Sequence, residues 1–395
     1  MTSKNLRWIF GFPLLYFAVL LFLSLYSYTQ VDLNLTLWAN PMYQSFQSFL
    51  LWVGYFNRFL SVSLFAFILF ALFFCYFLIL YKEKRSNVSA SDLKLLILGS
   101  ACILFFAYTA FSHDLFNYMF DARIVTKYSL NPYEFTALQF PDDLWVRFMH
   151  WTHRTYPYGP VWLVVTLPFS FIGSGKFVLT FVFFKLLFIL AYLGNSLLTY
   201  QILKKISPKQ AYRGLILFAL NPLILIETLV SPHNESLMLF FLLGSLYVFF
   251  VVERKILAIG FMLLSIGVKF ITFLPALPLF LSLIMRKSLT FKTYMYLALI
   301  MLGIGIGYEI YIREPYPWYF VMLIGILALL PTRNSILFIT TISISSLLRY
   351  IPYLLIGDYS LQTARIQDIL FWVPLVFMSM YLIKSFLRKY HIKQA

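Results

Sequence analysis

Long apolar runs constrain this chain more than any other feature of its sequence. They recur from the first run at 8–28 to the last at 366–386. Many reach roughly 17 to 25 residues, the length that an α-helix needs to cross ~30 Å of hydrocarbon. The composition agrees, since 61% of the residues are hydrophobic and only 12% are charged, against about a quarter charged in soluble domains. We therefore expect an all-α, polytopic membrane protein with one transmembrane domain over residues 1–395.

The positive charge of the chain is a topology signal. The formal net charge is +16, and such an excess can indicate a partner with many phosphates, such as nucleic acid. Here, however, Lys and Arg cluster in short segments between the apolar runs, as in membrane proteins that keep these residues on the cytoplasmic side. We therefore expect membrane lipid, and no nucleic acid, as a partner.

The apolar runs and the basic segments together predict a topology of about 12 transmembrane helices with both termini in the cytoplasm. The expected spans are 8–28, 60–81, 95–111, 177–203, 215–230, 237–252, 256–268, 270–285, 294–312, 320–330, 336–356 and 366–386. The run 161–172 is too short to cross. A crossing there would also place the basic segment 204–213 outside, so we expect a half-helix on the outer side.

Residues 113–160 form the polar part of the sequence, and this topology places them in an extracytoplasmic loop. If 114–127 is helical, Asp114, Asn117, Tyr118 and Asp121 fall at i, i+3, i+4 and i+7, which is one face. Such a helix can lie along the bilayer interface with its apolar side in lipid and its carboxylates toward water. The simpler alternative is a solvated loop whose charges only keep it out of the membrane.

Three further features carry polar groups close to apolar runs. The turn 231–235 (Ser-Pro-His-Asn-Glu) could equally be an ordinary loop with a helix cap. Lys269 lies between two short apolar runs, where an ionisable side chain costs ~2.5–3.5 kcal/mol and often marks a site; snorkelling to the interface is the alternative. The aromatic segment 316–319 (Tyr-Pro-Trp-Tyr) could simply be part of an interfacial aromatic belt.

Several familiar motifs are absent from the sequence. It contains no P-loop, no GxGxxG that opens a helix, no HExxH and no pair of CxxC motifs. These absences leave ATP-driven transport and redox chemistry without support.

Five short motifs, in order over residues 95–330, resemble those of the GT-C superfamily of membrane glycosyltransferases. The similarity is greatest to bacterial polyprenol-phosphate-sugar-dependent mannosyltransferases and related hexosyltransferases. The motifs are 114–123 with 131–133, 156–160, 221–222 with 233–238, 269–270, and 317–319. Two positions depart from the usual pattern: Ala122 stands where Gly often follows the acidic residue, and Glu235 where Asp is commoner.

The resemblance implies a hexosyltransferase of the bacterial plasma (inner) membrane. It would move a sugar, expected to be mannose, from a polyprenyl-phosphate carrier to a glycan, lipid or protein acceptor outside the cytoplasm. The family places an acidic residue of the first large outer loop at the active site, which here is Asp114. We expect Asp114 to act as the general base and Asp121 to orient the acceptor. Alternatively, the two could hold a divalent cation as a cofactor.

The expected substrate-binding residues come from the same motifs. Three cations are candidates for the leaving phosphate, namely Lys269, His233 and Arg123. The complete expected set is His113, Asn117, Tyr118, Arg123, Tyr158, His233, Asn234, Glu235, Lys269 and Trp318. We expect Lys269, His233 and Asp114 to converge in space.

A transporter or flippase for a lipid-linked sugar or small solute is the main alternative function. A transporter is expected to place its polar residues near the membrane midplane on interrupted spans. In this sequence the polar residues gather at one surface, which favours the enzyme.

Overall fold

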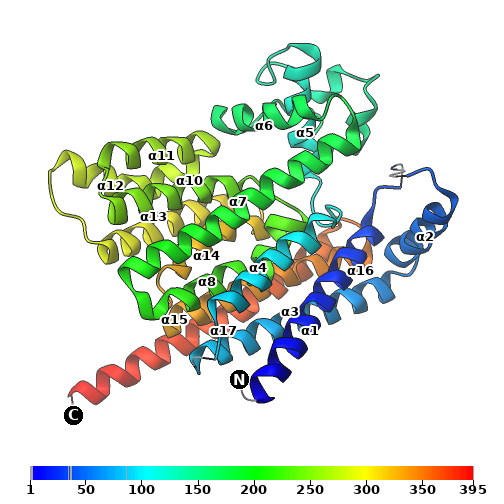
Figure 1. Cartoon of the computed structure of the whole chain (residues 1–395). Helices are drawn as coiled ribbons and strands as arrows, with labels where there is room; N and C mark the ends of the chain where they lie inside the picture. Colours follow the sequence, from blue (N-terminus) through cyan, green and yellow to red (C-terminus); the bar gives the residue numbers. More distant parts are fainter. Residues whose placement is uncertain (1–2, 34, 36–37, 86, 395) are drawn as a thin grey trace.

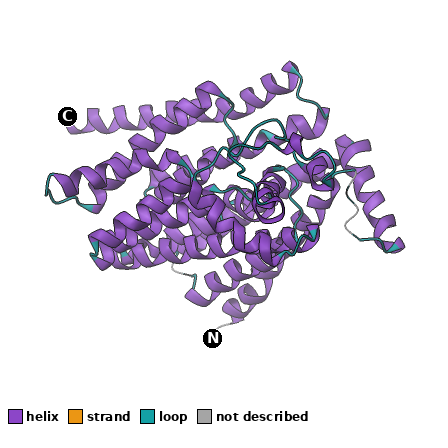
Figure 2. Cartoon of the chain, turned by 90° about the horizontal axis from the view of Figure 1, so that it is seen from above, coloured by secondary structure: helices purple, strands orange, loops and turns teal. Residues whose placement is uncertain are grey.

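The computed structural model describes residues 3–33, 35, 38–85 and 87–394, and these residues form helices and loops without a β-strand. This confirms the predicted all-α class, as the view from above in Figure 2 shows. The α-helices are α1 (Ser3–Ser27), α2 (Pro41–Leu51), α3 (Arg58–Lys84), α4 (Ala90–Phe105), α5 (Asp114–Tyr128), α6 (Pro160–Ile172), α7 (Phe177–Ile206), α8 (Ala211–Ala219), α9 (Pro222–Leu225), α10 (Glu235–Tyr247), α11 (Lys255–Val268), α12 (Phe273–Ile284), α13 (Phe291–Ile312), α14 (Phe320–Ala328), α15 (Arg333–Leu348), α16 (Tyr350–Ile356) and α17 (Leu361–Gln394). Short 3-10 or π-helical segments join them: η1 (Tyr28–Gln30), η2 (Trp52–Phe56), η3 (Ala137–Gln139), η4 (Leu144–Phe148), η5 (Pro208–Gln210), η6 (Ile226–Val230), η7 (Val248–Val252), η8 (Phe270–Thr272) and η9 (Pro317–Tyr319).

The number of full-length spans is lower than the sequence predicted. Within the described part of the chain, seven helices are long and apolar enough to cross a membrane, and an eighth span results if the bent pair 208–219 and 222–230 counts as one. Other predicted spans are too short. Helices α4 and α11 have 16 and 14 residues, which corresponds to about 24 and 21 Å at 1.5 Å per residue. The chain is therefore a polytopic membrane protein that combines long spans with several short apolar helices.

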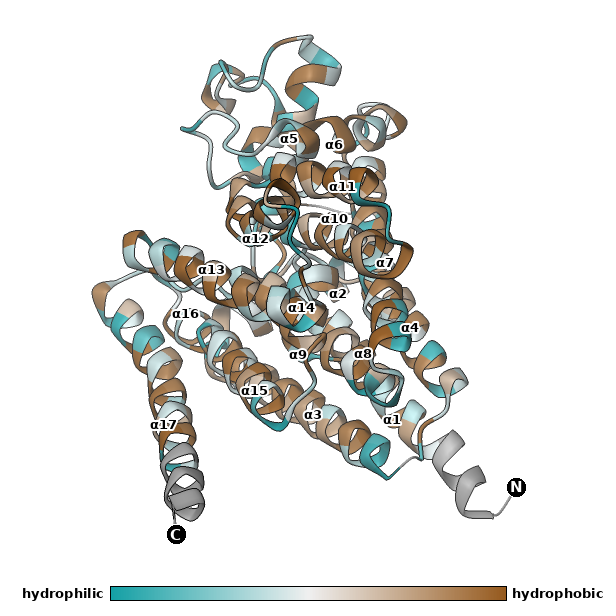
Figure 3. Ribbon diagram, turned by 90° about the vertical axis from the view of Figure 1, so that its left-hand side faces the viewer, coloured by the Kyte–Doolittle hydropathy of each residue, from teal (hydrophilic) through white to brown (hydrophobic). Residues whose placement is uncertain are grey.

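The polar loops gather at one end of the helix bundle. Figure 1 shows α5, α6 and the loops after α5 at this end, whereas the first turns of α1 and the last turns of α17 lie at the opposite end. Figure 3 shows the hydrophilic residues of these loops beyond the mostly hydrophobic helices. Helix α6 stays at the same end and does not run the length of the bundle, as a half-helix would.

Helix α5 has nearly the predicted bounds, but its surroundings differ from the prediction. We expected its apolar side to lie in lipid at the interface. Instead Phe116, Met119 and Phe120 are at most 2% exposed, and the ring of Phe116 lies 5.8 Å from that of Phe177 at the start of α7. The correction has a simple physical cause: the long α7 and the loops after α5 offer this apolar side a protein surface to pack against.

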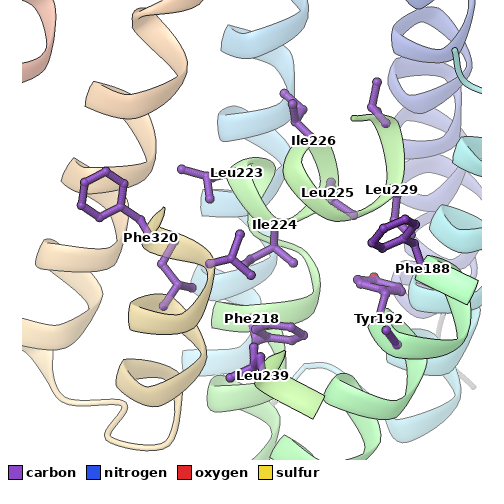
Figure 4. Packing of buried hydrophobic residues seen from close by; sticks show 14 of the residues in the cluster. Phe188, Tyr192, Phe218, Leu223, Ile224, Leu225, Ile226, Leu229, Leu239 and Phe320 are labelled. Atoms are coloured by element: carbon purple, nitrogen blue, oxygen red, sulfur yellow. The ribbon is translucent and has the colours of Figure 1, made fainter. Parts of the chain in front are cut away.

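A break in the helix between α8 and α9 directs the chain toward this polar end. Pro222 lacks a backbone N–H and disfavours a helical conformation at Asn221, whose ψ is 129°. The Asn221 side chain then caps α9 by accepting from the backbone N–H groups of Leu223 and Ile224. The two halves meet at 50°, within the buried cluster that Figure 4 shows between α7, α9 and α14.

Candidate active site

Asp114 occupies the first turn of α5, directly after the segment that leaves α4. Its backbone N–H donates to the Ser112 hydroxyl over 3.2 Å, and its carboxylate lies where the partial positive charge of a helix N-terminus favours an anion. The residue is buried, yet it lines a cavity of about 340 Å³. Other residues around this cavity include His113, His150, Trp151, Trp318 and Tyr350. Asp114 is therefore a carboxylate that a ligand in the cavity could reach.

The turn before α10 places a histidine beside this carboxylate. His233 Nε2 lies 3.8 Å from Asp114 Oδ2, and His233 Nδ1 lies 3.3 Å from Glu227 Oε2. Burial opposes protonation of the imidazole, but the contact with Glu227 and the charges of Glu227 and Asp114 outweigh it and raise the pKa of His233. The structure thus joins two residues of the predicted site, Asp114 and His233, that are far apart in the sequence.

Aromatic rings hold His233 from the side. The indole of Trp318 stacks on the imidazole with a centroid distance of 4.2 Å and an interplanar angle of 16°. Tyr316 in turn stacks on Trp318, with a centroid distance of 4.5 Å. The segment that the sequence offered as an interfacial belt therefore forms a wall of the cavity.

Lys269 joins the same turn through Glu235. Its Nζ lies 2.5 Å from Glu235 Oε1 and 5.4 Å from the ring centroid of Tyr319. The Lys269 side chain is 27% exposed, whereas that of Glu235 is 3% exposed. This ammonium group is thus held by a buried carboxylate but is still open to a ligand.

A close approach of two backbones brings Tyr158 to this region. The Gly159 N–H donates to Val268 O over 3.1 Å, and a Cβ on Gly159 would lie only 2.1 Å from Gly267 O. Only glycine fits this contact, which places Tyr158 next to the end of α11. Burial, together with the charges of Asp114, Asp121 and Glu235, raises the pKa of Tyr158 well above its usual value.

The predicted polar face of α5 points toward these groups. The Tyr118 hydroxyl accepts from the backbone N–H of Asn234 over 3.5 Å, and the Asn117 amide donates to Trp151 O over 3.4 Å. Burial and the nearby charge of Asp114 raise the pKa of Asp121 to about 7, against the opposing effect of Arg154. The face therefore combines hydrogen-bonding groups with a carboxyl that titrates near neutral pH.

Two expected residues of the α5 region have other partners. Arg123 pairs with Asp143 over 2.8 Å and stacks on the Trp145 ring at 3.9 Å. Burial alone would raise the pKa of Asp143, but hydrogen bonds from Lys127 and Arg123 hold it well below its usual range. Arg123 thus has a structural ion pair. The ring of His113 lies 3.8 Å from that of His150, and its pKa falls to about 4 through burial and the charge of His150.

The site predicted from the sequence left out two buried charged residues that support the turn. Glu227 is fully buried behind His233, and Lys185 is buried in α7, where its ammonium donates to the carbonyls of Leu229 and Val230. These carbonyls end η6, where a cation is favourable. The available signal was an ionisable residue inside an apolar run, at 185 and again at 227.

Few side chains in this region could act as ligands for a metal ion. Among the residues described by the structure, no three His, Cys, Asp or Glu side chains are grouped so that they could hold a metal ion. Asp114 and Asp121, the pair expected to hold a divalent cation, lie two turns apart on α5, about 10 Å along its axis. A cation bound there would need ligands from its substrates.

Comparison with known proteins then decides the family. A family model described as alpha-(1->6)-mannopyranosyltransferase, N-terminal domain, matches residues 17–286, which include Asp114, His233 and Lys269. The chain belongs to this family. It is therefore a mannosyltransferase, and the resemblance to membrane mannosyltransferases is confirmed. No curated protein and no solved structure matches it. Trp318 and Tyr350 of the cavity lie beyond the matched residues.

Proposed function

We propose that this mannosyltransferase has the GT-C architecture and takes mannose from a polyprenyl-phosphate carrier. The acceptor is a hydroxyl group on the extracytoplasmic side of a bacterial plasma membrane. One observation carries the proposal: Asp114 lines a cavity at the end of the bundle where the polar loops gather, with His233 3.8 Å away. A lipid carrier can present its phosphate there while its chain stays in the bilayer.

The reaction is a single displacement at the anomeric carbon. Asp114 accepts the proton of the acceptor hydroxyl as its oxygen forms the new bond to the anomeric carbon. The bond between that carbon and the phosphate oxygen breaks, and the polyprenyl phosphate leaves with the electron pair. A single displacement inverts the anomeric centre. Because the family name specifies an alpha product, the donor is the β-linked mannosyl phosphate.

Of the three cations expected at the leaving phosphate, Lys269 has the most exposed side chain. Arg123 is held in an ion pair with Asp143, and His233 lies between two carboxylates. The partly exposed Lys269 ammonium is oriented by Glu235 and can stabilise the charge that develops on the phosphate. Asn117, Tyr118, Tyr158 and Asn234 supply hydrogen-bonding groups for sugar hydroxyls.

A transfer assay tests this proposal directly. Membranes that contain the protein would be supplied with a panel of polyprenyl-phosphate sugars, with α- and β-linked mannosyl phosphates as separate members. We expect transfer from the β-linked mannosyl donor, and at least ~10²-fold less transfer in matched membranes that contain Asp114→Asn. Transfer from a nucleotide-linked mannose in membranes free of polyprenyl phosphate would contradict the donor. Movement of the lipid-linked sugar across vesicles without any transfer would favour the transporter alternative.

A further inference from the structure

Glu227 is a buried carboxylate to which the proposed reaction gives no role. It lies in η6, is fully buried, and is not one of the residues that line the cavity. Removing a carboxylate from water is expensive unless the group is paired. A carboxylate in this position therefore calls for a specific explanation.

The contacts of Glu227 divide between its two oxygens. The Tyr350 hydroxyl donates to Oε1 over 2.8 Å, and Oε2 faces His233 Nδ1 at 3.3 Å. The other imidazole nitrogen faces Asp114 at 3.8 Å. Glu227, His233 and Asp114 thus form a row in which the imidazole separates two carboxylates.

The row is held from several sides. Stacking against Trp318 fixes the plane of the His233 ring, and the backbone N–H of His233 donates to the backbone carbonyl of Glu227 over 3.1 Å. Lys185 secures the end of η6 between these two residues through the carbonyls of Leu229 and Val230. Because the His233 ring is held in this way, a change at Glu227 can alter the position of the Asp114 carboxylate.

We propose that Glu227 is a positioning residue that acts through His233 to orient the carboxylate of Asp114. The charge pair of Nδ1 with Glu227 at 3.3 Å sets the rotation of the ring, so that Nε2 faces Asp114 Oδ2 at 3.8 Å. The remaining oxygen, Oδ1, is then free to receive the proton of the acceptor hydroxyl. The inference rests on the proposed role of Asp114 as the base. A misplacement of a reacting group by 1 Å can lower a rate by ~10²-fold, which sets the expected size of the effect.

A double-mutant cycle separates this role from simple packing. The variants are Glu227→Gln, His233→Gln and their combination, with Glu83→Gln as the control. Glu83 pairs with Arg213 over 2.8 Å and has no contact with the row. The values of kcat and KM would be measured for purified protein in lipid, with activity normalised to folded protein.

We expect Glu227→Gln to lower kcat by ~10²-fold while KM changes by less than about 2-fold, which is the pattern of an interaction made in the transition state. In the His233→Gln background the same change should have no further effect, because the residue that transmits it is gone. The Glu83→Gln control should keep wild-type kcat. Additive losses, or a loss in KM alone, would overturn the inference.

Tyr350→Phe provides a second variant in case Glu227→Gln does not fold. It removes only the hydroxyl that holds Oε1, and we expect a smaller loss in kcat that also disappears in the His233→Gln background. A loss that persists in that background would overturn the inference.

The cycle is run with whichever mannosyl donor the wild-type protein uses. A donor other than polyprenyl phosphate would therefore contradict the proposed function and still leave the cycle informative. If Asp114→Asn is inactive and the losses in the double-mutant cycle are additive, only the role of Glu227 is rejected. Near-normal Asp114→Asn would reject the base and, with it, this inference.

Discussion

At the residue scale, Asp114 and Asp121 offer the sharpest comparison. Asp114 lines the cavity and contacts His233, whereas Asp121 lies two turns further along α5. Replacing Asp114 by Asn keeps its shape but removes the proton acceptor, so we expect transfer to fall by at least ~10²-fold with unchanged expression. Asp121→Asn should lower transfer less, unless the two residues hold a metal ion.

If Asp114 and Asp121 hold a metal ion, chelators should abolish wild-type transfer. Near-normal turnover by Asp114→Asn with a dead Asp121→Asn would identify Asp121 as the base.

The carboxyl of Asp121 also makes stability depend on pH. Its pKa is about 7 in the folded chain and ~3.9 in an unfolded one, so the unfolded state releases this proton first. The contribution of the neutral carboxyl to stability is therefore complete below pH ~4 and is lost as pH rises through about 7. We expect Asp121→Asn, which cannot ionise, to raise Tm relative to wild type at pH 8 and to have little effect at pH 4.5. Thermal unfolding in detergent at both pH values measures this difference, and an equal shift at both would contradict the raised pKa.

At the element scale, the contact between the loop before α6 and the end of α11 depends on Gly159. A methyl group at Gly159 would lie 2.1 Å from Gly267 O, and backbone is less able to move away than a flexible side chain. We expect Gly159→Ala to move Tyr158 away from the end of α11 and to lower both Tm and transfer. Gly260→Ala in α11 is the matched control, because nothing lies within 4 Å of its added Cβ. It should keep transfer and leave Tm unchanged or slightly raised, since Ala favours a helix by ~1 kcal/mol over Gly. Equal behaviour of the two variants would show that the close contact is unimportant.

At the scale of the whole molecule, the orientation in the membrane is the main prediction. The basic segments place Lys84 and Lys205 in the cytoplasm and the loops after α5 outside. Single cysteines at Lys84, Lys205, Leu138 and Asp142, all exposed positions, would be introduced into a Cys102→Ala background, because Cys102 is itself exposed. We expect an impermeant thiol reagent to label the cysteines at 138 and 142 in intact cells, and those at 84 and 205 only after permeabilisation. The reverse pattern would contradict both the orientation and an extracytoplasmic reaction.

The sequence alone was sufficient for the features that depend on local pattern. The apolar runs determined the all-α membrane class, because each helix must satisfy its own backbone hydrogen bonds in lipid. The spacing from Asp114 to Asp121 placed the polar residues on one helical face, and the structure has a helix with nearly those bounds. Isolated polar residues in an apolar context, such as His233 and Lys269, were recognisable because their burial is costly.

Only the tertiary structure decided which of these residues meet. The contact of Asp114 with His233 joins α5 to the turn before α10, and the contact of Glu227 with Tyr350 joins η6 to α16. Burial of α5 against α7, in place of an interfacial position, likewise depended on a neighbouring helix. A local sequence pattern shows which residues share one face of a helix and which of them are costly to bury. Which charges neutralise one another is decided by how helices distant in the sequence pack together.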